Sequence, residues 1–372
     1  MERKDVEIIT SESVNIGHPD KTCDYIADLF LDEALRQDPN SQMAVECAIK
    51  ENLLMIYGEK TSKGKINYKK IARQALREVG YNKKFKIIKK ISNQSPQINK
   101  AVGKKKPKAN DQGIVFGYAT DEGKNYLPLP IDMANKIMQS YEVFRKKNKE
   151  KYFSDAKVQI SIKYVNKKPL SIETLLISVS HKKGLLPKDI KDEIRKHVIL
   201  PSIREYKTYL DKLAIKNLLI NPSGEFSIWG SYSDSGCVGR KIVADNYGGS
   251  YKVGGGCFSS KNATKIDRSA AYYARYVAKN LVANKLAKKV GIEVSYAIGK
   301  EKPLSLNIEA SGLSKNITVL KLEEIVNKNF DFSVANIIKE LDLLKPIYSK
   351  TSVYGHFGKK NLPWERIKKL SK

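Results

Sequence analysis

The sequence has little cysteine and little histidine, with four of each in 372 residues. The cysteines lie far apart and form no Cys-x-x-Cys pair, and the histidines are equally scattered. The spacings of zinc sites are therefore absent, and a disulfide framework is not expected in a chain of this length. We interpret the cysteine usage as that of a reducing, cytoplasmic compartment.

Long apolar runs are also absent. No uninterrupted run approaches the roughly 18 residues that a membrane-spanning helix needs, so no membrane segment is expected. The chain begins MERKDVEIITSES without an apolar stretch behind the charges, and we therefore expect no secretory signal. The 41% hydrophobic and 29% charged residues are typical of a soluble globular protein. The length accommodates two or three domains of roughly 100–200 residues.

Acidic residues are scarce relative to basic ones, with 40 Asp and Glu against 68 Lys and Arg, a formal net charge of +28. One interpretation is a surface that binds nucleic acid. The other is a genome with A/T-rich codons, which the excess of lysine over arginine and the abundant Asn, Ile and Tyr favour. The lysines are spread along the chain, and only GKKKPK (103–108) is dense. Nucleic acid is therefore not expected as the main partner.

The stretch SESVNIGHPDKTCDYIADLF predicts a well-defined helix start. After Pro19, apolar residues recur at i, i+3, i+4, i+7, i+8 and i+11, which is one face of an amphipathic helix. Proline suits the first helical turn, and Asp20 suits the positive end of the helix dipole. His18 lies immediately before the helix. On this stretch alone, an ordinary capped helix with a solvent-facing histidine is the favoured interpretation.

Helical and alternating patterns follow one another along the chain and predict a mixed α+β fold. Strands are expected within 43–60, around a turn at 50–52, and at 156–164, in the run TLLISVSH, and at 291–299. Long helices are expected at 131–147, 187–214 and 266–288. Two aperiodic segments, the lysine-rich 95–113 and the glycine-rich 247–265, are expected to be mobile.

Two glycine-containing segments carry candidate phosphate ligands. In GGGCFSSKNATKID, Lys261 and Lys265 follow three glycines, and Asp267 opens a helix. Glycine-rich backbone, lysine and a helix start are how proteins hold polyphosphates, although a flexible glycine turn before a helix is the alternative. Neither a P-loop nor a dinucleotide fingerprint is present. In DSGCVGRKIVAD, Arg240 offers a bidentate fork and Lys241 a point charge.

With Lys157, these segments supply five candidate cations, and Asp20 and Asp267 are candidate metal-binding carboxylates. A carboxylate that binds magnesium usually shares the ion with substrate phosphates. The residues therefore favour a nucleoside triphosphate site with metal. No serine or cysteine is paired with a histidine in a recognisable nucleophile spacing.

An ordered set of motifs makes the chain recognisable: SESVNIGHPDK, NDQGIVFGYATDE, DAKVQ, INPSGEF, DSGCVGRK, DNYGG, GGGCFSSK, KIDRSAAYYARYVAKN, SYAIG, LDLLKPIY and YGHFG. Together they resemble the S-adenosylmethionine synthetase (methionine adenosyltransferase) family, from about Glu7 to Trp364. The resemblance implies that methionine sulfur attacks C5′ of ATP and displaces triphosphate, which is then hydrolysed to diphosphate and phosphate. It implies two Mg2+ per site and K+ as cofactors.

The resemblance also implies residue roles. His18 is expected at the leaving 5′-oxygen. Asp20 and Asp267 are expected to bind one Mg2+ each, and Glu46 to bind K+. The catalytic cations along the triphosphate are expected to be Lys157, Arg240, Lys241, Lys261 and Lys265. Further ATP-binding positions are Asp155, Glu225, Phe226, which should stack on adenine, Asp234 and Cys257. The methionine-binding positions are Glu59, Gln94, Asp111, Asp234 and Lys265.

Members of this family have three similar sheet-plus-helix domains related by pseudo-threefold symmetry, and form homodimers or homotetramers with sites at the subunit interface. Matched to this chain, the segments are an N-terminal domain (1–95), a mobile active-site loop (96–113), a central domain (114–222) and a C-terminal domain (223–372), interleaved in space. Within this scheme, Gln94 to Lys104 matches the gate over the site.

Several positions depart from the family pattern. Lys108-Ala109-Asn110 replaces a Gly-Ala-Gly, and the gate is a few residues shorter. The sequence Trp229-Gly230-Ser231 replaces Gly-Gly-Pro, Ser260 and Asn262 replace glycine and aspartate, and Glu225 stands where arginine is common. None removes a charged residue matched to metal or triphosphate. An impaired homologue that binds ATP without turnover, and a lysine-rich nucleic-acid-binding protein, remain as alternatives.

Overall fold

The computed structural model describes residues 5–94 and 107–371. Its strands are β1 (Val6–Val14), β2 (Gln42–Lys50), β3 (Leu53–Thr61), β4 (Lys86–Asn93), β5 (Gly113–Thr120), β6 (Tyr152–Val165), β7 (Lys168–His181), β8 (Lys212–Ile220), β9 (Gly236–Cys237), β10 (Lys289–Tyr296) and β11 (Ser305–Ser311). Its α-helices are α1 (Pro19–Gln37), α2 (Tyr68–Val79), α4 (Leu129–Lys147), α5 (Pro187–Ile194), α6 (Leu200–Arg204), α7 (Ile242–Asp245), α8 (Ile266–Ala283), α9 (Val319–Asn329) and α10 (Val334–Glu340).

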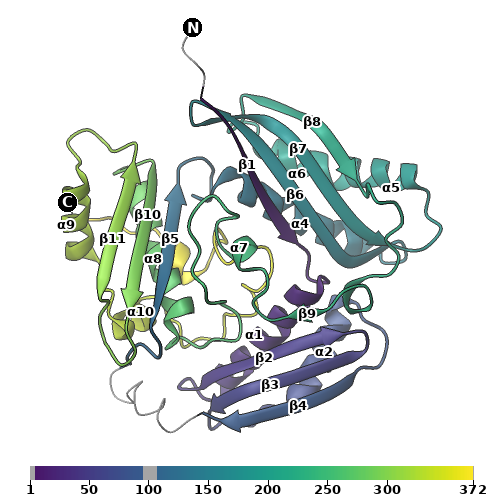
Figure 1. Cartoon of the computed structure of the whole chain (residues 1–372), viewed down its shortest axis with the longest axis horizontal. Coiled ribbons are helices and arrows are strands. Elements are labelled where there is room, and N and C mark those ends of the chain that lie inside the picture. The colour runs from purple at the N-terminus through teal and green to yellow at the C-terminus, as the bar shows by residue number, and fades with distance from the viewer. Residues whose placement is uncertain (1–4, 95–106, 372) are drawn as a thin grey trace.

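The strands form three separate sheets that surround the centre of the molecule (Figure 1). Their strand orders are β1-β6-β7-β8, β11-β10-β5 and β4-β3-β2-β9. Each sheet includes a strand from a distant part of the chain: β1 lies against β6, β5 against β10, and β9 against β2, all antiparallel. The sheets are therefore interleaved in sequence, and the chain crosses between them repeatedly.

Each sheet is covered by one long helix. Helix α1 packs on β2, α4 packs on β1 and β6, and α8 packs on β5 and β10. This arrangement confirms the expected α+β fold of three sheet-plus-helix units. The alternation in β2 shows why the sheet has two different faces: Met43, Val45, Cys47 and Ile49 are buried, whereas the residues between them are only half-buried.

Two hydrophobic cores hold these units. The larger joins α1, β2, β3, α8 and β10, and the smaller joins α4, β6 and β7. Nearly every residue of helix α8 is buried, including the arginines Arg268 and Arg275. Because a buried charge is costly unless it is paired, each of these arginines lies against a carboxylate, Asp28 and Glu365 respectively.

Several expected elements are confirmed, among them α1 beginning at Pro19, the β2–β3 hairpin with its turn at 51–52, and β6. The long helix expected at 187–214 is wrong. The helical segment is interrupted by a π-helical turn (Arg195–Ile199) and ends with α6 at Arg204, and the chain then enters β8. Parallel pairing with β7 satisfies the β8 backbone, so tertiary context overrides the local helical pattern. Helix α8 likewise ends at Ala283 rather than 288.

Candidate active site

The start of α1 is built as the sequence predicts. His18 is the N-cap residue, Pro19 is at the first helical position, and Asp20 is in the first turn. The His18 Nδ1 atom accepts a hydrogen bond from the Asp20 backbone N–H at 3.3 Å. On a neutral ring the proton therefore lies on Nε2, which leaves that nitrogen as a hydrogen-bond donor.

Burial is the main reason that the pKa of His18 falls to about 4, and the nearby charge of Lys241 lowers it further. Asp20 and Asp234 oppose this effect, and Lys157 adds to it. The imidazole is consequently neutral near pH 7. A neutral donor at a helix N-terminus suits a site where negative charge develops.

Asp20 connects α1 with the segment that contains β9. Its carboxylate, of which 1% is exposed, accepts from the Cys237 backbone N–H at 3.0 Å and from Lys241 Nζ at 2.7 Å. Arg240 lies 3.5 Å from the same carboxylate. Asp20 and Lys241 are more than 200 residues apart in the sequence. They meet because β9 pairs with the end of β2, and α1 packs against the same strand.

Lys157 and Asp155 come from β6. The Lys157 ammonium is 2.6 Å from Glu12 of β1, and both side chains are partly exposed. Asp155 is buried and accepts a 2.8 Å hydrogen bond from the Gly230 N–H. Burial raises the pKa of Asp155 to about 7, with a further contribution from Asp234. We call His18, Asp20, Lys157, Asp234, Arg240 and Lys241 the α1 group.

A second group gathers at the start of α8. Lys261 pairs with Asp267 at 2.6 Å, and its backbone forms an isolated bridge with Ala44 of β2. On the other side of Ala44, the directly opposite residue of β3 is Glu59. Residues paired across a sheet project from the same face, so Glu59 and Lys261 flank Ala44 on the half-buried face of this sheet.

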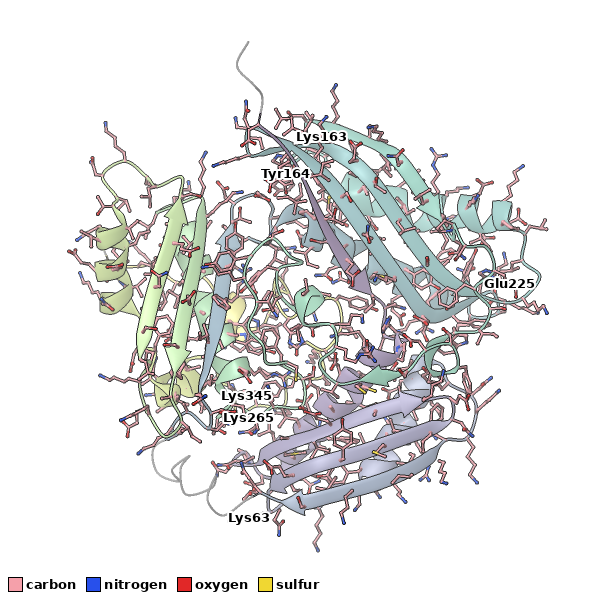
Figure 2. The ribbon with its side chains drawn as sticks, viewed as in Figure 1. Lys63, Lys163, Tyr164, Glu225, Lys265 and Lys345 are labelled. Carbon is pink, nitrogen blue, oxygen red and sulfur yellow. The ribbon has the colours of Figure 1, made fainter. Side chains whose placement is uncertain are left out.

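Lys265, the N-cap residue of α8, lies among these charges. Burial lowers the pKa of its ammonium, and Lys261 lowers it further, whereas Glu59, Asp111 and Asp267 raise it. In Figure 2, Lys265 lies where the β5 and β2 sheets approach each other. We call Glu59, Asp111, Lys261, Lys265 and Asp267 the α8 group.

The remaining site residues lie near one group or the other. Gln94 is buried beside β3, and its backbone N–H bonds to the Lys60 carbonyl at 3.2 Å. Glu46 is on β2 and accepts a 3.5 Å hydrogen bond from Tyr57. Cys257 precedes Lys261, and burial raises the pKa of its thiol to about 11. A thiol with this pKa is not a nucleophile at neutral pH.

Glu225 and Phe226, the positions matched to adenine binding, follow β8. The Phe226 backbone donates to His181 Nε2 at 3.2 Å and accepts from the His181 N–H at 2.9 Å. Figure 2 shows Glu225 at the opposite side of the molecule from Lys265. No hydrogen bond or ion pair within residues 5–94 and 107–371 joins the α1 group to the α8 group. The chain thus separates the site residues into two sets.

The structure accounts for several departures from the family pattern. Trp229 stacks between Tyr81, at 4.8 Å between ring centroids, and Phe153, at 5.8 Å. Ser260 has φ +74°, the region where glycine is favoured, and its N–H bonds to Asp28 at 3.0 Å. The Asn262 side chain accepts from the Met43 N–H at 3.1 Å. Trp229 and Asn262 thus have local partners, whereas Ser260 keeps a strained backbone and, among the described residues, a buried hydroxyl without a hydrogen bond. Apart from Gln94, the expected gate (94–104) lies outside the described residues.

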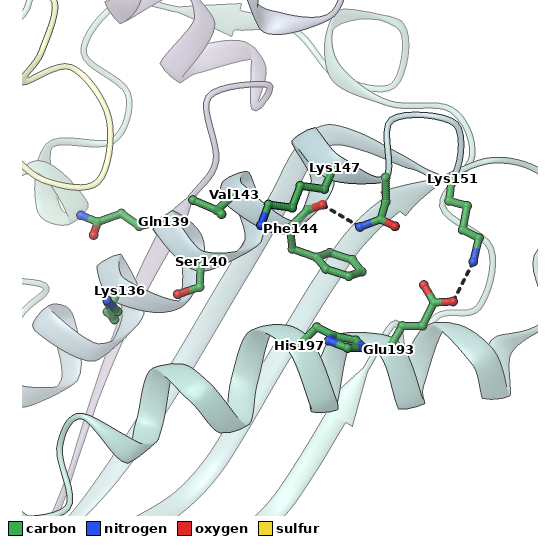
Figure 3. A pocket seen from close by; sticks show the side chains of 10 residues that line it. Lys136, Gln139, Ser140, Val143, Phe144, Lys147, Lys151, Glu193 and His197 are labelled. Carbon is green, nitrogen blue, oxygen red and sulfur yellow. Dashed lines mark hydrogen bonds and ion pairs between the residues drawn. The ribbon is translucent and has the colours of Figure 1, made fainter.

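A cavity of about 660 Å³ lies elsewhere, between α4, α5 and the π-helical turn (Figure 3). It is lined by Lys136, Gln139, Ser140, Val143, Phe144, Lys147, Asn148, Lys151, Glu193 and His197. The Lys151 ammonium is 2.8 Å from Glu193, and the Phe144 and His197 rings stack. None of the expected site residues lines this cavity, which forms no part of the candidate active site.

Sequence reasoning missed one prominent feature, a row of four aspartates on α1 at positions 20, 24, 28 and 32. All four are buried. The period of four is the signal in the sequence, but charged residues beside the apolar face of an amphipathic helix are normally exposed. Within the described residues, no three His, Cys, Asp or Glu side chains are placed to hold a metal ion among themselves. In the same part of the chain, no helix is both long enough and apolar enough to cross a membrane.

The site combines cations, carboxylates and a helix N-terminus at glycine-containing segments of an α+β fold. This combination is typical of enzymes that act on polyphosphate substrates. Comparison with known families narrows the class. The N-terminal, central and C-terminal domain profiles of S-adenosylmethionine synthetase match residues 6–105, 106–226 and 228–366. The chain belongs to this family, so it is a transferase that makes S-adenosylmethionine from ATP and methionine.

Individual relatives agree. The chain is 44% identical to the S-adenosylmethionine synthase of Mesoplasma florum, over 98% of both chains. It is 45% identical to that of Mycoplasma mycoides subsp. mycoides SC, over 98% of this chain and 95% of the relative. It is 42% identical to that of Petrotoga mobilis, over 98% and 97% respectively. The resemblance found in the sequence motifs is thereby confirmed along the whole chain.

Proposed function

We propose that the α1 group and the α8 group are the two halves of the site at which methionine sulfur attacks C5′ of ATP. The triphosphate leaves as a unit, and water then cleaves it to diphosphate and phosphate. The observation that carries this assignment is the convergence of His18, Asp20, Arg240 and Lys241 at the N-terminus of α1. A helix start with two cations and a neutral imidazole donor is arranged for an oxyanion leaving group.

The chemistry needs no general base, because a thioether sulfur is a neutral nucleophile without a proton. The barrier lies in aligning sulfur, carbon and oxygen and in expelling a highly charged group. His18 Nε2–H donates to the departing 5′-oxygen, and Lys157, Arg240, Lys241, Lys261 and Lys265 neutralise the phosphates. Phe226 packs on adenine beside Glu225, Asp155, Asp234 and Cys257. Glu59, Gln94, Asp111, Asp234 and Lys265 hold methionine.

The donor set of the two aspartates fits magnesium. Asp20 and Asp267 each offer hard carboxylate oxygens, and each now pairs with a lysine, Lys241 and Lys261 respectively. A single protein carboxylate per ion is the arrangement expected when phosphates complete the Mg2+ shell. When bound, the two Mg2+ ions would neutralise triphosphate charge. We assign Glu46, on the half-buried face of β2, to K+.

The separation of the two groups supports a homodimer, alone or paired into a tetramer, with each site shared between subunits. In this arrangement the α1 group of one protomer meets the α8 group of its partner. Exposed apolar side chains on the open sheet faces, among them Ile8, Met55, Ile88 and Ile114, fit a surface that another chain covers.

We retain 1–95, 96–113, 114–222 and 223–372 as the proposed segments, with a cytoplasmic location.

Product stoichiometry tests this proposal. With ATP, methionine, Mg2+ and K+, the purified protein is expected to form S-adenosylmethionine, diphosphate and phosphate in equal amounts, measured by chromatography and phosphate analysis. Omission of Mg2+ should abolish all three products, because the triphosphate charge is then uncompensated. Release of intact triphosphate, or undiminished turnover without Mg2+, would contradict the proposed chemistry.

A further inference from the structure

Helix α1 carries four aspartates at intervals of four residues, and this spacing places them on one face of the helix. Each accepts a backbone N–H from the C-terminal part of the chain, and Asp20 and Asp24 share one segment. Asp20 accepts from the Cys237 N–H at 3.0 Å, and Asp24 accepts from the Gly239 N–H at 2.9 Å. Asp28 accepts from the Ser260 N–H at 3.0 Å. Asp32 accepts from the Tyr348 N–H at 2.8 Å and from the Ser349 N–H at 2.9 Å. We call these residues the aspartate row.

Asp20 binds the Lys241 side chain directly, whereas Asp24 holds the backbone of the Gly-Arg-Lys segment (239–241) at Gly239. The other carboxylate oxygen of Asp24 accepts from Lys21 Nζ at 3.0 Å, and Lys21 also pairs with Asp245. Gly239 and Asp245 stand on either side of Arg240 and Lys241. Both flanks of the cationic dipeptide are thus fixed to one turn of α1 through completely buried side chains.

The surroundings of Gly239 restrict the position of the Gly-Arg-Lys segment. The φ of Gly239 is +77°, and a Cβ atom at this position would lie 2.5 Å from the Cβ of Cys257. The Gly-Arg-Lys segment is therefore confined between Asp24 on α1 and Cys257 in the glycine-rich segment 254–261. A loss of the Asp24 hydrogen bond would let it move relative to His18 and Asp20, which are on the same helix as Asp24.

We infer that Asp24 is a positioning residue for the reaction: through the Gly239 N–H and Lys21, it fixes the distance of Arg240 and Lys241 from His18 and Asp20. This inference rests on the proposed function of those four side chains. Asp24 itself contacts no phosphate in this scheme. Since a displacement of about 1 Å in a positioned group can cost about 10² in rate, the effect should be kinetic as well as structural.

The matched control is Asp32, which is buried on the same helix face but holds Tyr348 and Ser349 instead of a cationic segment. Asp24→Asn keeps the size of the side chain, but its amide cannot accept from both Gly239 and Lys21. Lys21 keeps Asp245, so the variant is expected to fold. Asp24→Glu keeps the charge and moves the carboxylate outward by one methylene.

The experiment measures kcat and KM for ATP and for methionine, with thermal unfolding of each variant. Asp24→Asn and Asp24→Glu should lower kcat/KM for ATP by about 10- to 100-fold. They should leave KM for methionine within about twofold, because most of the proposed methionine positions lie outside the segment that Asp24 holds. Asp32→Asn should lower the melting temperature but keep both kinetic constants within about twofold of the original.

Equal kinetics for the Asp24 and Asp32 variants would overturn the inference, and so would full rescue by Asp24→Glu, which would show that only charge balance matters. If Asp24→Asn does not fold, Asp24→Glu gives the same decision. Lys241→Met is measured beside them. A Lys241→Met protein with unchanged turnover contradicts the proposed function itself, whereas an impaired Lys241→Met with a normal Asp24→Asn contradicts only the role of Asp24.

Discussion

Replacing Gly256 with alanine is expected to lower the rate of S-adenosylmethionine formation by about 10². A Cβ atom at this position would lie 2.2 Å from both Cγ and Oδ2 of Asp267. The carboxylate would have to leave its place, which would break the 2.6 Å ion pair with Lys261. Asp267 is the proposed ligand of one Mg2+, so the variant should also need more Mg2+ for half-maximal rate.

The adjacent glycine is the control. A Cβ atom on Gly255 would meet no atom within 4 Å, so Gly255→Ala is expected to keep the rate within about twofold. Both variants lose the same backbone freedom, and only one displaces Asp267. The measurement is initial rate against Mg2+ concentration for the two variants. Equal rates and equal Mg2+ dependence would show that Asp267 has no role in turnover.

Replacing His18 with alanine is expected to lower kcat for S-adenosylmethionine formation by about 10²–10³, the usual cost of losing one donor to a developing oxyanion. The variant also loses the bond from the Asp20 N–H to Nδ1, a helix cap whose removal costs roughly 1 kcal/mol. The cap affects stability rather than turnover, so both kcat and the unfolding temperature must be measured.

A second histidine provides the comparison for His18. His197 lies in the π-helical turn and lines the cavity of Figure 3, away from both groups. His197→Ala should therefore keep kcat within about twofold. If the two histidine variants had the same kcat, the leaving-group role of His18 would be wrong.

The sequence was a good guide where local chemistry decides the structure. Pro19 and Asp20 marked the start of α1 because proline and acidic residues suit the first helical turn, and the α1 N-cap is where the sequence places it. The alternation of apolar and polar residues at 156–164 predicts a strand, because successive side chains of a strand point to opposite faces, and β6 is found there. The motifs around His18, Arg240 and Lys261 were sufficient to recognise the family, which the domain matches confirm.

The structural features that the sequence does not predict depend on contacts between distant segments. Residues 212–214, the end of the expected helix, instead begin strand β8, for which β7 offers a parallel partner. The aspartate row appears polar and solvent-facing until its N–H partners, more than 200 residues away, are known. The division of the site residues into an α1 group and an α8 group is equally invisible in the sequence, since Lys241 and Lys261 are close in sequence but pair with different carboxylates.

The most direct test of the shared site is a mixed dimer of His18→Ala, from the α1 group, and Lys261→Met, from the α8 group. The two variants are co-expressed with different tags, and the heterodimer is purified through both. If each site takes one group from each chain, one site of the heterodimer carries both substitutions and the other carries neither. Activity of about half that of the original protein is then expected, although each variant alone is nearly inactive. A heterodimer no more active than the separate variants, or failure of the two chains to purify together, would contradict the account.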